Sequence, residues 1–275
     1  MKAKELFPEV FSRHAQAYRR RQEQLLGHGD HPGRLRLIDW IAPVPGEQIL
    51  DLACGPGTLT FRIAERVAPD GEAVGIDLAP GMIEVAQAAT PPGLPARFEL
   101  MDMEDLRFPD ASFDAAACGH GLQFCPDLHR ALTESRRVLV EEGRFAASVP
   151  AGRGGRAHEA MERIVAARLP PAPSAPDRAA TQRTTQDPRA LQAAAATAGF
   201  RDIRVEQIQE CHRWNSPAHY VGMADTWWVL ASRLDQVTPD ERDQVLKDAQ
   251  AAIESELGSG PVEVLADVIL LFARA

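Results

Sequence analysis

Two carboxylates and a glycine turn give this sequence its clearest chemical capacity. Asp51 lies inside the apolar run 49–53, a turn follows at Gly55 and Gly57, and Asp77 ends a second apolar run 20 residues after Gly57. Glycine lets the backbone approach a ligand closely, and a helix that begins just after the turn offers free N–H groups. A carboxylate at the C-terminal end of a strand can accept hydrogen bonds from both hydroxyls of a ribose. These residues predict a pocket for a small polar or anionic ligand.

The flanking sequence predicts the elements that position these residues. The run 49–53 is typical of a buried parallel strand, and apolar residues from Thr58 onward fall on one side of a helix. Further apolar runs predict strands at 73–77, 97–101 and 113–118. Ligands of open α/β sheets bind outside the C-terminal ends of such strands, so we expect the pocket at that edge.

Two kinds of ligand fit a strand, a glycine turn and a helix. A dinucleotide fingerprint requires G-x-G-x-x-G, and Thr60 stands where its third glycine belongs. Asp51 also lies within the strand, where that motif has no use for a carboxylate. A nicotinamide-dependent dehydrogenase is therefore the least supported interpretation.

The pattern hydrophobic-hydrophobic-Asp-x-Ala-Cys-Gly-x-Gly at 49–57 resembles motif I of class I S-adenosylmethionine-dependent methyltransferases. The segment 106–114 is close to that family's L-P-F-x-D-x-S-F-D stretch, with Arg107 in place of the proline. The segment 11–18 resembles the F-x-x-x-A-x-x-Y entry of the ubiquinone- and menaquinone-biosynthesis type. The resemblance covers residues 7–150 well and the rest in outline, and the turn Glu141-Glu142-Gly143 departs from the family's Lys-Pro-Gly-Gly.

The resemblance implies a Rossmann-like, doubly wound, mostly parallel seven-stranded sheet with an antiparallel last strand, an N-terminal helical lid and helical insertions. It implies a lid at 1–45, a cofactor-binding core at 46–150, and a remainder at 151–275 with substrate-cap insertions at 151–190 and 212–258. The closing strand, 262–272, should pair antiparallel with a strand at 200–208.

The resemblance also implies a set of cofactor contacts. Asp51 would hold the amino group of the methionine part, Asp77 the ribose, and Asp102 the exocyclic amine of adenine. Asp77 has an alternative role as the cap of the helix that begins near Pro80, and Tyr18 has one in core packing. The implied cofactor-binding residues are Tyr18, Asp51, Ala53, Gly55, Gly57, Asp77, Leu78, Met82, Asp102, Met103 and Gly119.

Methyl transfer from a sulfonium needs a general base only when the acceptor must lose a proton. His120, which follows the fourth predicted strand, is the first candidate because histidine ionises near neutral pH. His14, on the lid, is the second, and His212, beyond the sixth strand, is the third. Each has an alternative role as a pocket-lining or capping side chain.

An aromatic segment between the last two strands predicts the acceptor site. Tyr220 and Trp227 form either the wall of an apolar substrate pocket or the core-facing side of a helix, and Gln123 is a third substrate candidate. A small apolar or aromatic acceptor is expected, with O- or C-methylation and S-adenosylhomocysteine as the product. Arginine outnumbers lysine, which occurs only at positions 2, 4 and 247, and this weakly favours a bacterial secondary metabolite.

Composition narrows the alternatives. The chain has 275 residues, 45% of them hydrophobic, and a formal net charge of −9, which argues against nucleic acid as a partner. The four cysteines lack metal-type spacing, so no metal is expected. Because no apolar leader or long apolar stretch occurs, we expect a soluble, cytoplasmic protein without membrane insertion, either a monomer or a homodimer. A cyclase or isomerase that retains the cofactor, and a non-catalytic cofactor-binding partner subunit, stay open.

Overall fold

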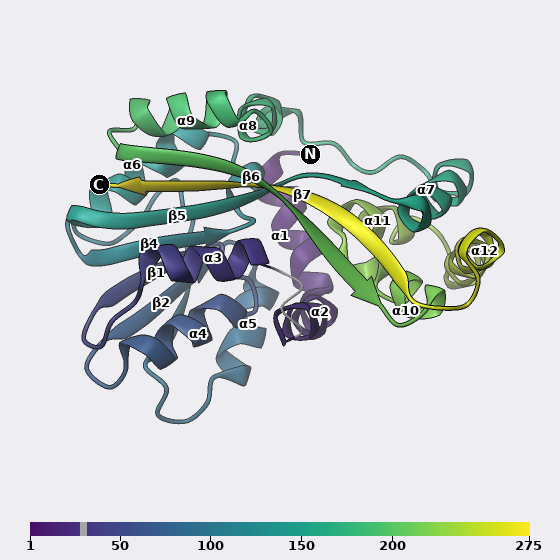
Figure 1. The fold of residues 1–275 in the computed structure, drawn as a ribbon, viewed down its shortest axis with the longest axis horizontal. Helices are drawn as coiled ribbons and strands as arrows, with labels where there is room; N and C mark the ends of the chain where they lie inside the picture. Colours follow the sequence, from purple (N-terminus) through teal and green to yellow (C-terminus); the bar gives the residue numbers. More distant parts are fainter. Residues whose placement is uncertain (28–31) are drawn as a thin grey trace.

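Seven strands form one sheet in the computed structural model, which describes residues 1–27 and 32–275 (Figure 1). The strand order is β3-β2-β1-β4-β5-β7-β6, and β7 runs antiparallel to both of its neighbours whereas the other pairs are parallel. The predicted Rossmann-like sheet with an antiparallel last strand is thus confirmed. The strands are β1 (Gln48–Leu52), β2 (Glu72–Asp77), β3 (Ala96–Leu100), β4 (Phe113–Gly119), β5 (Leu139–Gly154), β6 (Arg201–Trp214) and β7 (Val262–Arg274).

Helices cover both faces of the sheet because the apolar side chains of each strand alternate between the two faces. Ile49 packs with α3 (Pro32–Ile41) and α4 (Thr58–Val67), and Leu50 and Leu52 pack on the other face with α6 (Leu128–Val138) and α9 (Pro188–Thr197). The remaining helices are α1 (Ala3–Arg13), α2 (Ala15–Gly27), α5 (Pro80–Ala89), α7 (Arg156–Arg168), α8 (Ala179–Thr185), α10 (Pro217–Val221), α11 (Trp228–Leu234) and α12 (Pro239–Leu257), with short 3₁₀ turns at Leu122–Phe124, Pro176–Arg178 and Ala224–Thr226.

The last three strands are longer than the sequence predicts. The strand expected at 200–208 continues to Trp214, so His212 lies within β6 and not beyond it. Likewise β5 runs to Gly154, past the expected start of an insertion at 151. These strands extend from the sheet into a second lobe, where α7, α10, α11 and α12 enclose a separate apolar core (Figure 1). Hydrogen bonding of β5 and β6 to β7 maintains the length of these strands, which the local sequence pattern does not predict.

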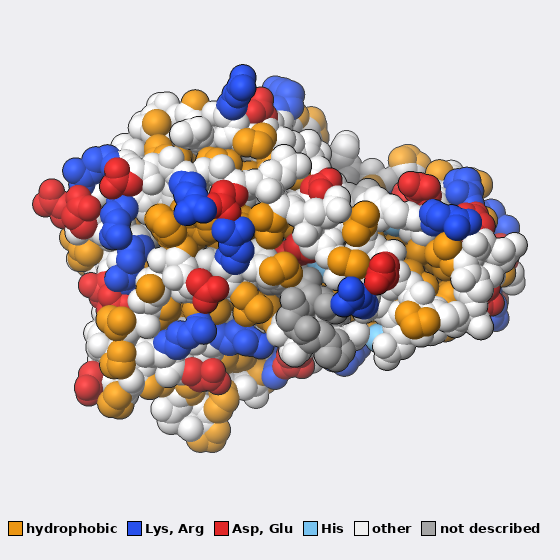
Figure 2. Space-filling model, viewed as in Figure 1, with side chains coloured by type: hydrophobic (Ala, Val, Ile, Leu, Met, Phe, Trp, Pro, Cys, Tyr) orange, Lys and Arg blue, Asp and Glu red, His pale blue; other side chains and the backbone are white. Residues whose placement is uncertain are grey.

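The N-terminal helices α1 and α2 lie between the sheet and the second lobe (Figure 1). One face of α1 buries Ala3, Leu6, Phe7 and Val10, the spacing of an amphipathic helix. Acidic and basic side chains alternate across the face shown in Figure 2. None of the helices in the described part of the chain is long and apolar enough to cross a membrane.

Candidate active site

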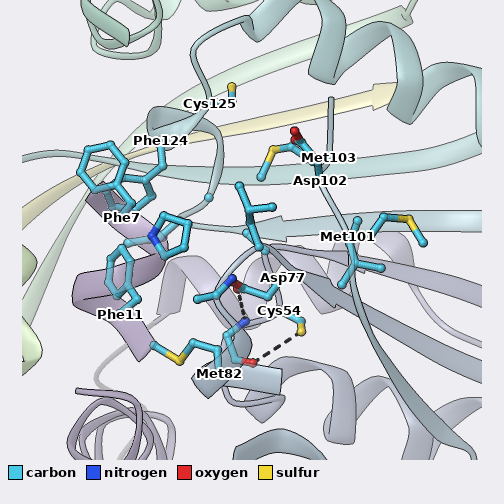
Figure 3. A pocket seen from close by; sticks show the side chains of 18 of the residues that line it. Phe7, Phe11, Cys54, Asp77, Met82, Met101, Asp102, Met103, Phe124 and Cys125 are labelled. Atoms are coloured by element: carbon cyan, nitrogen blue, oxygen red, sulfur yellow. Dashed lines mark hydrogen bonds between the residues drawn. The ribbon is translucent and has the colours of Figure 1, made fainter. Parts of the chain in front are cut away.

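A cavity of about 110 Å³ lies at the C-terminal ends of β1, β2 and β4, beneath α1 (Figure 3). The structure brings most of the predicted cofactor residues together here. Those that line the cavity are Tyr18, Ala53, Gly55, Asp77, Leu78, Met82, Asp102, Met103 and Gly119, together with His120.

Asp77 holds the glycine turn in place. One carboxylate oxygen accepts from the backbone N–H of Gly55 at 2.9 Å, and the other accepts from that of Ala79 at 2.8 Å (Figure 3). Burial raises the pKa of this carboxyl group, and the backbone hydrogen bonds oppose the rise. Asp77 is thus not the N-cap of α5, although it accepts from the backbone of Ala79, the N-cap residue just before that helix.

Gly57 lies behind the cavity wall and does not line the cavity. Its φ is +80°, and a Cβ atom there would come within 2.7 Å of the Phe98 ring. Glycine is thus required at this position by backbone conformation and by packing, which shape the turn from behind.

Asp51 also lies behind the wall, almost fully buried at 1% exposure. Burial raises its pKa to about 7, while the Thr60 hydroxyl and the charge of Arg34 oppose the rise. Thr60 donates its hydroxyl hydrogen to Asp51 at 2.6 Å. Thr60, which replaces the third glycine of the dinucleotide fingerprint, therefore binds Asp51, the strand carboxylate that the fingerprint lacks. This hydrogen bond explains both departures from that motif.

The raised pKa of Asp51 predicts a pH-dependent stability. Because the folded state keeps this proton up to about pH 7, against a usual value of 3.8, its contribution is fully present below about pH 4 and is lost as the pH rises through 7. We expect the unfolding free energy of the ligand-free protein to fall by up to about 1.4 kcal/mol per pH unit relative to Asp51→Asn in this window. Chemical denaturation at pH 5 and pH 8 tests this, with the exposed Asp70→Asn as the control. Parallel pH curves for wild type and Asp51→Asn would contradict it.

The first turns of α1 reach across to the predicted adenine site. The Lys4 ammonium pairs with Asp102 at 2.6 Å and with Glu104 at 2.5 Å, and Asp102 also accepts from the backbone N–H of Glu104. No local pattern predicts a role for Lys4, because this contact joins segments about a hundred residues apart. Asp102 is therefore already shared between the N-terminal helix and its own loop.

A second cavity, of about 430 Å³, adjoins the first. Residues that line both are Phe11, Tyr18, Arg34, His120 and Phe124. Trp227, Trp228 and Leu230 of the second lobe form much of its apolar wall, and Gln123 also lines it. A volume of this size is within the usual range for small-molecule sites.

His120 stands where the two cavities meet. Its φ is +63°, a conformation that few residues other than glycine, asparagine and aspartate adopt readily. Ser148 holds it twice, through Nδ1 to the serine hydroxyl at 2.6 Å and through its backbone N–H to the serine carbonyl at 3.0 Å. The Gln123 amide donates to the His120 carbonyl at 2.7 Å. Such over-determined strain is typical of functional sites.

Two predicted site residues lie elsewhere. The His14 ring bonds through Nε2 to Asp235 at 3.2 Å and lines neither cavity, because it sits at the end of α1 facing the second lobe. Tyr220 is fully buried beside Trp214 and Trp227, its hydroxyl bonded to His158 at 3.2 Å, so it packs in the core as the alternative interpretation had it.

Arg34 is a site residue that the sequence analysis missed. It lines both cavities at 6% exposure, and its Nη2 donates to the Tyr18 hydroxyl at 3.1 Å. Its Nε has no hydrogen-bond partner within the described residues. A signal was present, since Arg34 shares the core-facing stripe of α3 with Leu37, Ile38 and Ile41. A charge on such a stripe indicates a buried role.

Comparison with known families finds a match for the part of the chain that supplies most of the wall of the first cavity. A family model described as a methyltransferase domain matches residues 49–143. Residues 49–143 form a methyltransferase domain. The resemblance found in the sequence is thereby confirmed for this part.

Relatives of the methyltransferase domain act on different molecules. A demethylmenaquinone methyltransferase of Symbiobacterium thermophilum is 42% identical over 104 residues, which are 37% of this chain and 41% of the relative. An aklanonic acid methyltransferase of Streptomyces sp. strain C5 is 42% identical over 122 residues, which are 44% of this chain and 56% of the relative. The chain thus spans about half the length of the curated relatives it matches.

Solved structures share the fold over more of the chain. The YcgJ protein of Bacillus subtilis has a TM-score of 0.55 at 19% identity, over 89% of this chain and 98% of its own. The cyclase SpnF has a TM-score of 0.53 at 20% identity, over 89% of this chain and 80% of its own. At these identities the likeness concerns the fold alone. Most of the wall of the second cavity lies outside the methyltransferase domain.

Proposed function

We propose that this protein is an S-adenosylmethionine-dependent methyltransferase that transfers a methyl group to a small apolar or aromatic metabolite. The observation that carries the proposal is the junction of the two cavities. The smaller one adjoins the glycine turn and the strand-end carboxylates, the larger one is walled by aromatic side chains, and His120, Tyr18 and Arg34 border both.

The residues of the smaller cavity fit this cofactor, which supplies an activated methyl group when bound. A ribose would meet Asp77 and an exocyclic amine would meet Asp102. Asp51 lies behind the wall, so it would favour the amino group of an amino acid through its charge and not by direct contact. Arg34 would pair with the carboxylate of that amino acid, since its guanidinium is buried with an unused Nε.

The chain's own contribution would be alignment and the exclusion of water. Aromatic rings of Phe7, Phe11, Tyr18, Phe124 and Trp228 form a chain of contacts with centroids 4.8–5.9 Å apart, which joins α1 and α2 to the second lobe. In this proposal, the chain of rings would close the junction when the cofactor and acceptor are bound. The lid role predicted for the N-terminal helices is part of this proposal.

Several observations support a small acceptor. The second cavity is large enough for a ring system, and its lining combines aromatic and aliphatic side chains with convergent polar and charged groups. Relatives include methyltransferases named for a demethylmenaquinone, for aklanonic acid and for nocamycin, the last an O-methyltransferase of Saccharothrix syringae. We propose O- or C-methylation of such a metabolite.

The proposal is tested by titrating dialysed protein with S-adenosylmethionine and S-adenosylhomocysteine in a calorimeter, followed by a screen of aromatic acceptors. Mass spectrometry should find a methylated product and S-adenosylhomocysteine in equal amounts. A rearranged product without S-adenosylhomocysteine would instead identify a cofactor-retaining cyclase. Binding of NADH with no binding of either S-adenosyl compound would reject the proposal.

Arg34→Met should weaken S-adenosylhomocysteine binding about 30-fold, since one charge-assisted pair in a buried site contributes about 2 kcal/mol. The same variant should bind 5′-methylthioadenosine, which has the nucleoside but no amino acid, as wild type does. Calorimetric titration with both compounds separates the two effects. The exposed Arg66→Met on α4 is the matched control. Equal weakening for both compounds would contradict the assignment of Arg34 to the carboxylate.

A further inference from the structure

Arg178 is a buried cation in the wall of the acceptor cavity. It ends the short 3₁₀ turn Pro176–Arg178, is 8% exposed and lines the second cavity but not the first. Its Nη1 donates to the Gln123 carbonyl at 2.9 Å. Within residues 1–27 and 32–275, its Nε and Nη2 make no hydrogen bond and its guanidinium forms no ion pair.

Asp177, the carboxylate next to Arg178 in the sequence, binds the N-terminus of α1. Both oxygens of Asp177 accept from the backbone N–H of Ala3 at 3.1 Å, so this carboxylate caps the positive end of α1. Asp177, the residue next to Arg178 in the sequence, therefore interacts with the N-terminal helix and forms no ion pair with Arg178 in the described part of the chain. The arginine side chain turns the other way, into the cavity wall.

Aromatic rings enclose the guanidinium. Its central carbon lies 4.9 Å from the centroid of Phe7, 5.3 Å from that of Trp228 and 5.9 Å from that of Phe124. Such contacts favour a cation but replace only part of the water it has lost. Burial accordingly lowers the pKa of Arg178, opposed by the charge of Asp177. A charge held in this way is stabilised by a ligand that brings the opposite charge.

Several other charged groups line the second cavity. Glu210 accepts from the Gly33 backbone N–H at 2.8 Å and bonds to His212 at 3.0 Å, and Arg34 belongs to the cofactor side of the junction. Glu162 is half-buried at the cavity's edge on α7. Arg21 also lines only the second cavity, with its guanidinium 5.8 Å from the centroid of the Trp227 ring. Arg178 is the arginine of this cavity whose guanidinium lies against Phe7, Phe124 and Trp228.

We propose that Arg178 is a specificity-determining residue that binds a carboxylate carried by the aromatic acceptor. Its Nε and Nη2 offer the parallel pair of donors that a carboxylate accepts in bidentate fashion. The acceptor's ring would pack on Trp228 and the neighbouring aromatic wall. This inference rests on the proposed function, and it narrows the acceptor class to planar aromatic acids.

The test uses 2-naphthoate and its neutral analogue 2-naphthamide as probes, titrated at pH 7.5 with S-adenosylhomocysteine saturating. Wild type should bind the acid at least tenfold more tightly than the amide. Arg178→Met should bind both with equal affinity, and Arg178→Lys should keep only a reduced preference, since lysine lacks the bidentate geometry. Arg183→Met removes an exposed charge from nearby α8, outside both cavities, and should behave as wild type.

Two outcomes overturn the inference: a wild-type protein that does not prefer the acid, including one that binds neither probe, or an undiminished preference in Arg178→Met. If Arg178→Met does not fold, an undiminished preference in Arg178→Lys overturns it instead. The cofactor titration is run on the same samples. Failure of wild type to bind S-adenosylhomocysteine rejects the proposed function, whereas retained binding without a preference for the acid rejects Arg178 alone.

Discussion

Replacement of Asp77 by alanine is expected to weaken binding of S-adenosylmethionine and S-adenosylhomocysteine at least about 100-fold. Two losses combine. The ribose would lose a charged acceptor, and the glycine turn would lose the carboxylate that receives the N–H groups of Gly55 and Ala79. A hydrogen bond to a charged group contributes about 1.5–3 kcal/mol, so two such losses exceed the 2.8 kcal/mol that a 100-fold change requires. Calorimetric titration of dialysed protein measures the effect directly.

Two further variants define what Asp77 contributes. Asp77→Asn keeps the size of the side chain but loses one acceptor and the charge, so its affinity should fall between those of wild type and alanine. Glu72→Ala removes a carboxylate from the opposite end of the same strand and should bind as wild type. An Asp77→Ala protein that melts normally and binds within threefold of wild type would show that the ribose lies elsewhere.

The sequence predicts the central part of the fold because its signals there are local. Strand β1, the turn at Gly55 and helix α4 follow one another within 20 residues, and each has a period or a breaker of its own. The acidic residues of the site were found because each lies at or near the C-terminal end of its own strand: Asp51 within β1, Asp77 at the end of β2 and Asp102 just after β3. Their meeting at one edge is then a consequence of parallel strands.

The other site residues depend on contacts between distant parts of the chain. Lys4 meets Asp102, and Arg178 meets Phe7 and Trp228, across separations that no local pattern encodes. The length of β6 is a similar case, since its pairing with β7 carries it to Trp214. A burial pattern could have revealed Arg34 but not the cavity it faces.

Aromatic residues show the same limit within one short segment. The sequence makes Tyr220 and Trp227 equally good candidates for the wall of the substrate pocket, yet of the two only Trp227 lines the second cavity. Tyr220 turns toward Trp214 on β6, which the longer strand brings into the second lobe. The length of β6 therefore determines that Tyr220 packs in the core of the second lobe, and this length could not be predicted from the sequence.

His120→Asn is the second variant with a large expected effect. Asparagine tolerates the positive φ of this position, so the turn after β4 should form as in wild type. If His120 removes a proton from the acceptor, kcat should fall about 100-fold or more, the range for the loss of a general base. The affinity for S-adenosylhomocysteine should stay within about threefold, because the cofactor's charged groups face other residues. Initial rates at saturating concentrations of both substrates measure the change.

A general base and a pocket wall differ in two measurements. A base works only when it is neutral, so the wild-type rate should fall as the pH drops, and His120→Asn should lose that dependence. In Ser148→Ala the rate should still fall at low pH, but over a different pH range, because the serine hydroxyl bonds to Nδ1 and orients the ring. An acceptor that is already ionised needs no base, so wild type and His120→Asn should methylate it at similar rates. His120→Asn could instead slow the methylation of ionised and neutral acceptors equally and still lose rate at low pH. In that case the ring only shapes the junction, and the proton must leave by another route.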